Sequence, residues 1–287
     1  MRILVTGADG QVGQALRRLG ADRDLLALDR TALDITDAAA VARVVPEVRA
    51  DVVINAAAYT AVDRAQSESD QAFAVNGDGP ANLARACLEA AIPLFHISTD
   101  YVFDGSRPGA YSEDDPVAPL GVYGQSKWAG EARVREILPR HLILRTSWVF
   151  GLEGNNFVRT MLRLGREREA LRVVDDQRGC PTFADHIATV LLALAERLPG
   201  QALDWGTYHY CDTPETTWYG FASAIFQQAA RRQPLALRDL HPITTAEYPT
   251  PARRPANSVL DCRRLGQRYG IVPQPWAAGL QRLLATV

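Results

Sequence analysis

Three glycines near the N-terminus constrain the fold of this chain most strongly, because they separate an apolar run from an amphipathic segment. Gly7, Gly10 and Gly13 lie in TGADGQVG, where RILVTG (2–7) runs into GQVGQALRRLG (10–20). The first segment predicts a buried strand and the second an amphipathic helix. Glycines in such a unit allow a tight turn, close approach of the backbone to a pyrophosphate and close helix–strand packing. We therefore predict a dinucleotide-binding loop; the alternative is a tight turn that binds nothing.

The alternation of strand and helix continues as far as residue 150. Further strands are predicted over 24–29, 50–58, 92–99 and 141–150. Helices are predicted over 123–138 and over 70–90, where the sequence GDGP could interrupt or kink the helix. Strands that alternate with helices in this way form a parallel sheet covered on both faces. The predicted class is α/β, with a Rossmann-type doubly wound parallel sheet.

The alternation loosens after residue 150. We predict helices over 184–198 and 218–232, a further strand over 207–212, and loops over the site in the Pro- and Arg-rich segment 233–258. The expected NAD(P)-binding Rossmann domain spans residues 1–152, and about 180–214 returns to it. A smaller, partly interleaved C-terminal domain of about 153–179 and 215–287 is expected to bind the substrate.

The composition argues against several classes of partner. Of the 287 residues, 47% are hydrophobic, and 31 basic against 33 acidic side chains give a net charge of −2, which argues against nucleic acid. No apolar run approaches the roughly 20 residues of a membrane span, and a strand that begins at residue 2 leaves no room for a signal peptide. Four scattered cysteines without a CxxC pair argue against structural zinc and favour a reducing compartment. We predict a cytoplasmic protein with no metal, nucleic-acid or membrane partner.

The end of the second predicted strand bears on the choice of cofactor. Asp29 closes that strand and can hydrogen-bond an adenine ribose, which disfavours a 2′-phosphate. Arg30 follows it and could instead pair with such a phosphate, or be a solvated surface charge. Asp34 and Ile35 offer an edge for the adenine, although Asp34 could equally cap a helix. Both NADH and NADPH are therefore allowed.

Tyr123 and Lys127 are one helical turn apart in YGQSK, and they are the candidates for proton transfer. A tyrosine titrates near pH ~10, so lowering its pKa by ~2–3 units requires ~3–4 kcal/mol in favour of the phenolate. An ammonium at ~4 Å in an effective dielectric of ~20 supplies up to ~4 kcal/mol. Lys127 could therefore lower the pKa of Tyr123 and also hold the cofactor ribose.

The fourth predicted strand ends in ISTDYVFDG, at the same edge of the sheet as Tyr123. The hydroxyls of Ser98 and Thr99 could hydrogen-bond a substrate oxygen or adjust the pKa of Tyr123. A polar strand end that caps a turn is the alternative.

These stretches together resemble the extended short-chain dehydrogenases/reductases, and within them the dTDP-4-dehydrorhamnose reductases. The resemblance rests on TDYVFDG, YGQSKWAGE, ILRTSWVFG, QRGCPT, NAAAYTAVDRAQ and RRPANSVLD, and it covers nearly the whole chain. It implies NAD(P)H-dependent reduction of the 4-keto group of dTDP-4-dehydro-β-L-rhamnose, a dTDP-4-keto-6-deoxyhexose. The product would be dTDP-L-rhamnose for cell-surface polysaccharides.

The resemblance also implies roles for individual residues. Tyr123 would be the proton donor, Lys127 its electrostatic and ribose-binding partner, and Thr99 the hydroxyl that adjusts the site. The remaining expected contacts fall into four groups: Gly7, Gly10, Gln11, Val12 and Gly13 around the pyrophosphate; Asp29, Asp34 and Ile35 near the adenosine; Ala56, Ala57, Ala58 and Thr60 along the cofactor; and Thr99, Asp100, Trp148, Arg254 and Asn257 against the substrate. A core aromatic is the alternative for Trp148, and a solvated loop charge is the alternative for Arg254.

Two departures from the family pattern limit what is carried over. Some relatives bind magnesium at a dimer interface through an acidic residue two positions after the third glycine, where this chain has Ala15. We therefore predict no metal, and a homodimer stays open. Gln66 replaces a frequent glutamate without touching the catalytic set.

Three other functions remain as alternatives. The first is a reductase of another nucleotide-linked 4-keto-6-deoxysugar. The second is a non-catalytic regulatory subunit resembling the β subunit of methionine adenosyltransferase. The third is an epimerase or dehydratase, although Thr99 is not followed by the Asp-Glu pair usual in dehydratases.

Overall fold

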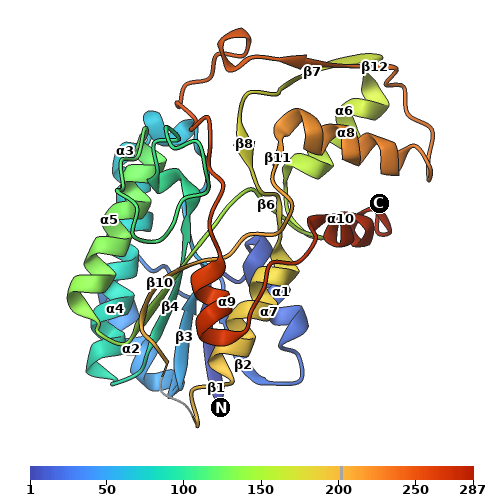
Figure 1. Ribbon diagram of the computed structural model, residues 1–287. Coiled ribbons are helices and arrows are strands. Elements are labelled where there is room, and N and C mark those ends of the chain that lie inside the picture. The colour runs from blue at the N-terminus through green and yellow to red at the C-terminus, as the bar shows by residue number, and fades with distance from the viewer. Residues whose placement is uncertain (201–202) are drawn as a thin grey trace.

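The computed structural model describes residues 1–200 and 203–287, and it is built around a six-stranded parallel sheet (Figure 1). The strand order is β10-β5-β4-β3-β1-β2. These strands are β1 (Arg2–Thr6), β2 (Asp24–Leu28), β3 (Val52–Asn55), β4 (Leu94–Thr99), β5 (His141–Thr146) and β10 (Gly206–His209). The order reverses between β1 and β3, and ligands of such sheets bind at this point, beyond the carboxyl ends of the strands. The predicted α/β class is confirmed.

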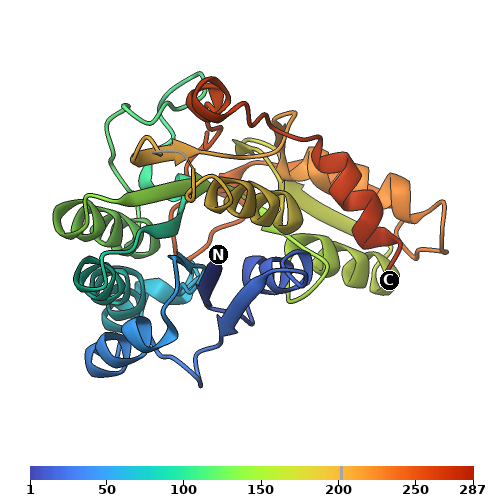
Figure 2. The ribbon, with the colours of Figure 1, turned by 90° about the horizontal axis from the view of Figure 1, so that it is seen from below.

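Helices cover both faces of the sheet (Figure 2). On one face α1 (Gln11–Leu19) packs against α7 (Ala184–Ala195). On the other face α4 (Gly79–Glu89) lies between α2 (Ala38–Val48) and α5 (Val122–Ile137). Alternate residues of β1 therefore enter different cores, with Ile3 and Val5 on the α1 side and Leu4 on the α2 side. All three are fully buried, as a strand covered on both faces requires.

The helix predicted over 70–90 is interrupted, as its GDGP sequence suggested. It divides into α3 (Ser69–Phe73), a π-helical turn (Ala74–Asp78) and α4. Asn76 in that turn is buried and donates hydrogen bonds to the Tyr59 carbonyl and the Ser126 hydroxyl. The turn thereby ties the loop after β3 to helix α5.

A second hydrophobic cluster lies beyond the carboxyl edge of the sheet, at the upper right of Figure 1. Its interior includes Phe150, Phe183, Phe221 and Leu280, all nearly or fully buried. Its side chains come from β6 (Val149–Phe150), α6 (Phe157–Glu167), β7 (Ala170–Val174), β9 (Thr182–Phe183), α8 (Trp218–Ala229), β12 (Asp239–Ile243) and α10 (Trp276–Leu284). The short strands β8 (Arg178–Gly179) and β11 (Thr216–Thr217) pair with each other nearby (Figure 1). The helix α9 (Arg263–Tyr269) returns to the main sheet and packs against β10.

Two predictions about local structure are wrong. The strand expected over 141–150 is broken between β5 and β6, because Trp148 adopts a left-handed backbone conformation with φ of 45°. The segment 233–258, predicted as loops, contains β12, which pairs in parallel with β7 and buries Ile243. That partner lies about 70 residues earlier, so no local pattern reveals the pairing.

Within the described residues, no helix combines the length and apolar character needed to cross a bilayer.

Candidate active site

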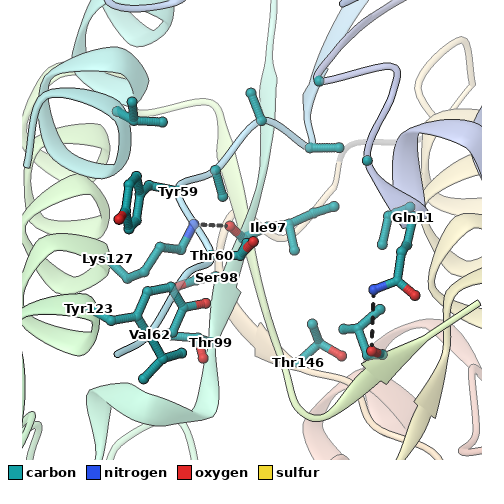
Figure 3. A pocket seen from close by; sticks show the side chains of 18 of the residues that line it. Gln11, Tyr59, Thr60, Val62, Ile97, Ser98, Thr99, Tyr123, Lys127 and Thr146 are labelled. Atoms are coloured by element: carbon teal, nitrogen blue, oxygen red, sulfur yellow. Dashed lines mark hydrogen bonds between the residues drawn. The ribbon is translucent and has the colours of Figure 1, made fainter. Parts of the chain in front are cut away.

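A cavity of about 770 Å³ opens where the main sheet meets the second cluster. It runs from the turn after β1, past the loop after β3 and the end of β4, to helix α5 and the start of α8. Figure 3 shows Gln11 on one side of this cavity and Tyr123 and Lys127 on the other. Its volume lies within the range of about 300–1,000 Å³ that small-molecule and cofactor sites occupy.

The glycine turn between β1 and α1 is built for close approach. Gly7 has φ of +76°, and a Cβ placed on it would lie 2.4 Å from the Ala57 nitrogen. A Cβ on Gly13 would lie 2.1 Å from the Gly7 carbonyl oxygen, so this glycine lets α1 pack directly on the turn. Gly7, Gly10, Gln11 and Val12 line the cavity, whereas Gly13 lies behind them. These residues fit a pyrophosphate held at a helix N-terminus.

The predicted adenosine contacts divide into two groups. Arg30, Asp34 and Ile35 line the cavity, and Arg30 Nε donates to Asp34 Oδ2 at 3.0 Å. Asp34 also accepts from the backbone and hydroxyl of Thr36, and these hydrogen bonds together with Arg30 hold the pKa of its carboxyl below the usual value despite some burial. Asp29 does not line the cavity, since its side chain caps the amide of Ala32 at 2.8 Å.

The loop after β3 forms one wall of the cavity with small side chains. Ala56, Ala57, Ala58 and Thr60 all line it, as predicted. Asn55 holds the start of this loop, because its side-chain oxygen accepts hydrogen bonds from the Ala57 amide and the Thr6 hydroxyl. Alanines leave room beside the glycine turn for a flat ligand.

Tyr123 and Lys127 project from the first turns of α5 into the cavity, with Thr99 beside Tyr123 at the end of β4 (Figure 3). Lys127 is buried, and its ammonium donates to the Ile97 carbonyl at 2.7 Å. The structure therefore brings together the three residues that the sequence proposed for proton transfer.

The pKa of Tyr123 departs from the sequence-based expectation. Burial raises it to about 12, while a hydrogen bond with Thr99 acts in the opposite direction. Burial also lowers the pKa of Lys127 to about 8, against the attraction of Glu131. Desolvation thus decides the direction of the Tyr123 pKa shift, in place of the lowering that we expected from Lys127, and Tyr123 holds its proton near neutral pH.

A buried carboxylate supports this part of the site from behind. Glu131 lies one turn after Lys127 and is fully buried, and it accepts from Ser98 Oγ at 2.6 Å and from Arg145 at 2.9 and 2.7 Å. Arg135 pairs with the same carboxylate. The Ser98 hydroxyl is therefore directed at Glu131, and Thr99 is the strand-end hydroxyl beside Tyr123.

Asp100 and Trp148 both line the cavity. Trp148 stacks on Trp218 with ring centroids 3.6 Å apart and an angle of 6° between the planes. The indole of Trp148 also covers Gly179, where an added Cβ would lie 2.4 Å from the ring. A flat apolar wall of this kind suits the ring or methyl group of a deoxysugar.

Arg254 and Asn257 do not line the cavity. Arg254 pairs with both oxygens of Asp63 at 3.1 and 2.8 Å. The buried Asn257 amide donates to the carbonyls of Arg107 and Gly109. Both side chains hold loops in place, and a substrate contact by either stays a prediction.

Several residues of the cavity were not found from the sequence. They come from loops and helix starts whose position depends on the whole fold, and they include Tyr59, Val62, Gln71, Tyr101, Asn156, Phe157 and Trp218. A signal existed for Asn156 alone: it precedes an amphipathic segment and caps α6 by accepting from the Arg159 amide.

The whole chain matches one family model, described as "RmlD substrate binding domain", over residues 1–287. The chain is 46% identical to a dTDP-4-dehydrorhamnose reductase of Aggregatibacter actinomycetemcomitans, with 99% of this chain and 98% of the relative covered. It is 42% identical to the protein of the same name from Escherichia coli K12, with 99% and 97% covered.

Solved structures agree with these relatives. A dTDP-4-dehydrorhamnose reductase from Clostridium acetobutylicum superposes with a TM-score of 0.93 at 37% identity, covering 99% of each chain. The enzyme of that name from Bacillus anthracis, solved in complex with NADP, gives a TM-score of 0.91 at 38% identity, covering 100% of this chain and 99% of that one.

Proposed function

Because the chain belongs to the dTDP-4-dehydrorhamnose reductase family of NAD(P)H-dependent oxidoreductases, we propose that Tyr123 protonates the sugar oxygen in the reaction. The family reaction reduces the 4-keto group of a dTDP-linked sugar and gives dTDP-L-rhamnose. The observation that carries the role of Tyr123 is its place with Lys127 and Thr99 in the same cavity as the glycine turn.

The described residues fit a dinucleotide cofactor. We propose that Gly7, Gly10, Gln11 and Val12 face its pyrophosphate, with Gly13 permitting the close packing behind them. Arg30, Asp34 and Ile35 would hold the adenosine end, and the alanines after β3 would leave room along its length. A reduced nicotinamide supplies the hydride. Lys127 would bind the adjacent ribose, which keeps Tyr123 at the reacting end of the cavity.

The protonation states favour Tyr123 as the acid. Its raised pKa keeps the phenol protonated at neutral pH, so it can donate to an oxygen that gains negative charge. Lys127, with a pKa of about 8, is mostly charged at that pH. Its charge would then stabilise the phenolate that remains, with the Thr99 side chain beside it.

We propose dTDP-4-dehydro-β-L-rhamnose as the substrate. The sugar would lie between Tyr123 and the stacked Trp148 and Trp218, with Asp100 facing one of its hydroxyls. The product would serve cell-surface polysaccharide synthesis.

The wider organisation of the chain also stays a proposal. The main sheet would form the cofactor domain, 1–152 with about 180–214, and residues of about 153–179 and 215–287 would form the substrate domain. Residues 201–202, inside the returning segment, lie outside the described residues. A homodimer and a cytoplasmic location remain predictions from the sequence.

A coupled assay tests the reaction. dTDP-4-dehydro-6-deoxyglucose is supplied with a 3,5-epimerase, and the oxidation of NADH and of NADPH is followed separately. Oxidation that requires the epimerase supports the proposed substrate. No oxidation with either cofactor would favour another sugar or a non-catalytic binding protein.

The Tyr123→Phe variant tests the proton donor. It should bind NADPH normally and lose about 10²–10⁴ in kcat, the usual contribution of a positioned acid. Tyr248→Phe, at an exposed tyrosine outside the cavity, is the matched control and should retain activity. Turnover of Tyr123→Phe close to that of the wild type would refute the assignment.

A further inference from the structure

Asp100 is a buried carboxyl group whose hydrogen bonds are incomplete. It follows Thr99 at the start of a short 3-10 helix (Asp100–Val102), is 2% exposed, and lines the cavity. Its Oδ1 accepts from the Thr99 hydroxyl at 2.9 Å. Its Oδ2 is buried without a hydrogen-bond partner among the described residues. A buried carboxylate with a free oxygen is costly, so a group of this kind calls for an explanation.

The Thr99 hydroxyl connects this carboxyl to the proposed proton donor. Thr99 Oγ1 donates to Asp100 Oδ1, and the Thr99 side chain lies beside Tyr123 (Figure 3). The Tyr101 amide donates to the same oxygen at 3.2 Å and fixes its position. A hydroxyl has one proton to give and lone pairs to accept another, so it can pass a proton between two neighbours.

We propose that Asp100 returns a proton to Tyr123 through the Thr99 hydroxyl after each reduction. The proposal rests on the role of Tyr123 as proton donor. Once Tyr123 has given its proton to the sugar oxygen, the Thr99 O–H bond breaks as a new O–H bond forms on Tyr123. The Asp100 O–H bond breaks as the Thr99 hydroxyl is restored. Asp100 is left as a carboxylate and regains a proton from water, so that one proton moves and nothing is oxidised.

The surroundings of Asp100 suit this exchange. Burial raises the pKa of its carboxyl to about 7, while the nearby Ser258 hydroxyl and the hydrogen bond from Thr99 act in the opposite direction. Near neutral pH both its acid and its carboxylate are populated, which a group that gives and regains protons requires. The titratable and charged side chains around this hydroxyl chain are Tyr101, Tyr123, Lys127, Asp63 and Arg254.

The Asp100→Asn variant separates proton return from the hydride step. Its amide oxygen can still accept the Thr99 hydroxyl, but it has no acid proton to give. In stopped-flow measurements with NADPH, the variant should oxidise a burst equal to the concentration of sites. Its steady-state kcat should then be about 10²-fold below that of the wild type, the lower range for positioned proton transfer. Asp70→Asn, at an exposed aspartate on α3, is the control and should leave kcat unchanged.

Two further measurements identify Asp100 as the group that returns the proton. The wild-type kcat should fall as the pH rises above about 7, and Asp100→Asn should retain only the later fall that belongs to Lys127, near pH 8. Infrared spectra of the free protein should show a protonated-carboxyl band that disappears through the same range and is missing in the variant.

Substitution of Thr99, whose hydroxyl would pass the proton, gives an independent test if Asp100→Asn does not fold. Thr99→Val should show the burst and the slow steady state, and Thr99→Ser should restore the steady rate. A burst and steady rate that fall together, or an effect confined to KM, would overturn the relay. So would an unchanged kcat and pH profile in Asp100→Asn. If Tyr123→Phe is inactive while Asp100→Asn behaves as the wild type, only the relay fails; an active Tyr123→Phe would remove the proposed donor itself.

Discussion

The two ends of the cavity are built from different parts of the chain. The cofactor end consists of backbone and small side chains, namely the glycine turn after β1 and the alanines after β3. The catalytic end consists of buried titratable side chains just after β4 and on α5, among them Asp100, Lys127 and Glu131. Shape therefore controls the first end, whereas desolvation and charge control the second. A substitution that changes charge without changing size should act mainly on the catalytic end.

The strongest test of this difference is Glu131→Gln. The change keeps the size of the side chain but removes the charge that Arg145 contacts through two nitrogens in a buried site. Leaving one partner of such a pair buried alone costs about 3–5 kcal/mol, so the free energy of unfolding in urea should fall by about that amount. The loss of Glu131 should also lower the pKa of Lys127 further, because Glu131 raises it.

Glu136→Gln is the control for that experiment, since Glu136 is exposed on the same helix. Its free energy of unfolding should change by less than about 0.5 kcal/mol. Equal losses in the two variants would show that the buried charge has no special cost.

The buried carboxyl of Asp100 should lower the free energy of unfolding when it is ionised. Because burial raises the pKa of this carboxyl from 3.8 to about 7, the unfolded chain releases its proton earlier than the folded protein as the pH rises. As the pH rises from about 4 to about 7, ionisation of this carboxyl therefore lowers the free energy of unfolding, and the loss is complete above that range. Asp100→Asn should remove that loss and be more stable than the wild type at pH 8, by up to about 4 kcal/mol at 1.36 kcal/mol per unit.

Chemical unfolding at pH 4 and at pH 8 measures this gain directly. The difference between variant and wild type should be larger at pH 8 than at pH 4. A difference that does not change with pH would mean that the carboxyl of Asp100 titrates normally. A larger difference at pH 8 would show that the catalytic end keeps the ionisable Asp100 at the expense of stability, as is common at active sites.

At the cofactor end, size should matter more than charge. In Gly13→Ala the new methyl group would meet the Gly7 carbonyl oxygen at 2.1 Å, and overpacking of this kind costs about 1–3 kcal/mol. In Gly10→Ala the nearest atom lies at 3.4 Å, and the methyl group would project where the pyrophosphate is proposed to lie.

Gly13→Ala should therefore lose both stability and affinity for the cofactor, whereas Gly10→Ala should lose affinity alone. Thermal unfolding should show a lower Tm for Gly13→Ala, whereas Gly10→Ala should unfold like the wild type. Titration with NADPH should show weakened binding in both variants. A normal Tm in Gly13→Ala would mean that α1 can shift away from the turn without cost.

The sequence located the glycine turn and the Tyr123–Lys127 pair, but it did not show the contacts that the fold adds around them, and the reason is physical. Gly7, Gly10 and Gly13 act within one local unit, so their spacing together with the neighbouring hydrophobic pattern was enough. The stack of Trp218 on Trp148 joins residues 70 positions apart, and no local pattern indicates it.

Burial of charge was the other property that the sequence did not show. Glu131 lies in an amphipathic helix, where a glutamate is ordinarily exposed, and its burial follows only from Arg145 on the neighbouring strand β5. The expected lowering of the Tyr123 pKa failed for the same reason, since Lys127 was considered without the desolvation of the tyrosine itself.

The smallest predicted effect lies at the exposed rim of the cofactor end, where charge can act only weakly. The Arg30 side chain is 70% exposed and is held by Asp34 at 3.0 Å, beside the proposed site of the adenine ribose. A 2′-phosphate on that ribose would pair with Arg30, but water and salt screen an exposed pair to about 1 kcal/mol or less. Arg30→Ala should therefore raise the KM for NADPH by about 3–5-fold and leave the KM for NADH unchanged.

Arg43→Ala, at an exposed arginine of α2 outside the cavity, should change neither value. An equal rise for both cofactors would show that Arg30 contacts the part that they share. A selective rise would instead locate the choice between NADH and NADPH in a charge pair at the rim, the one place at this end where charge rather than shape decides.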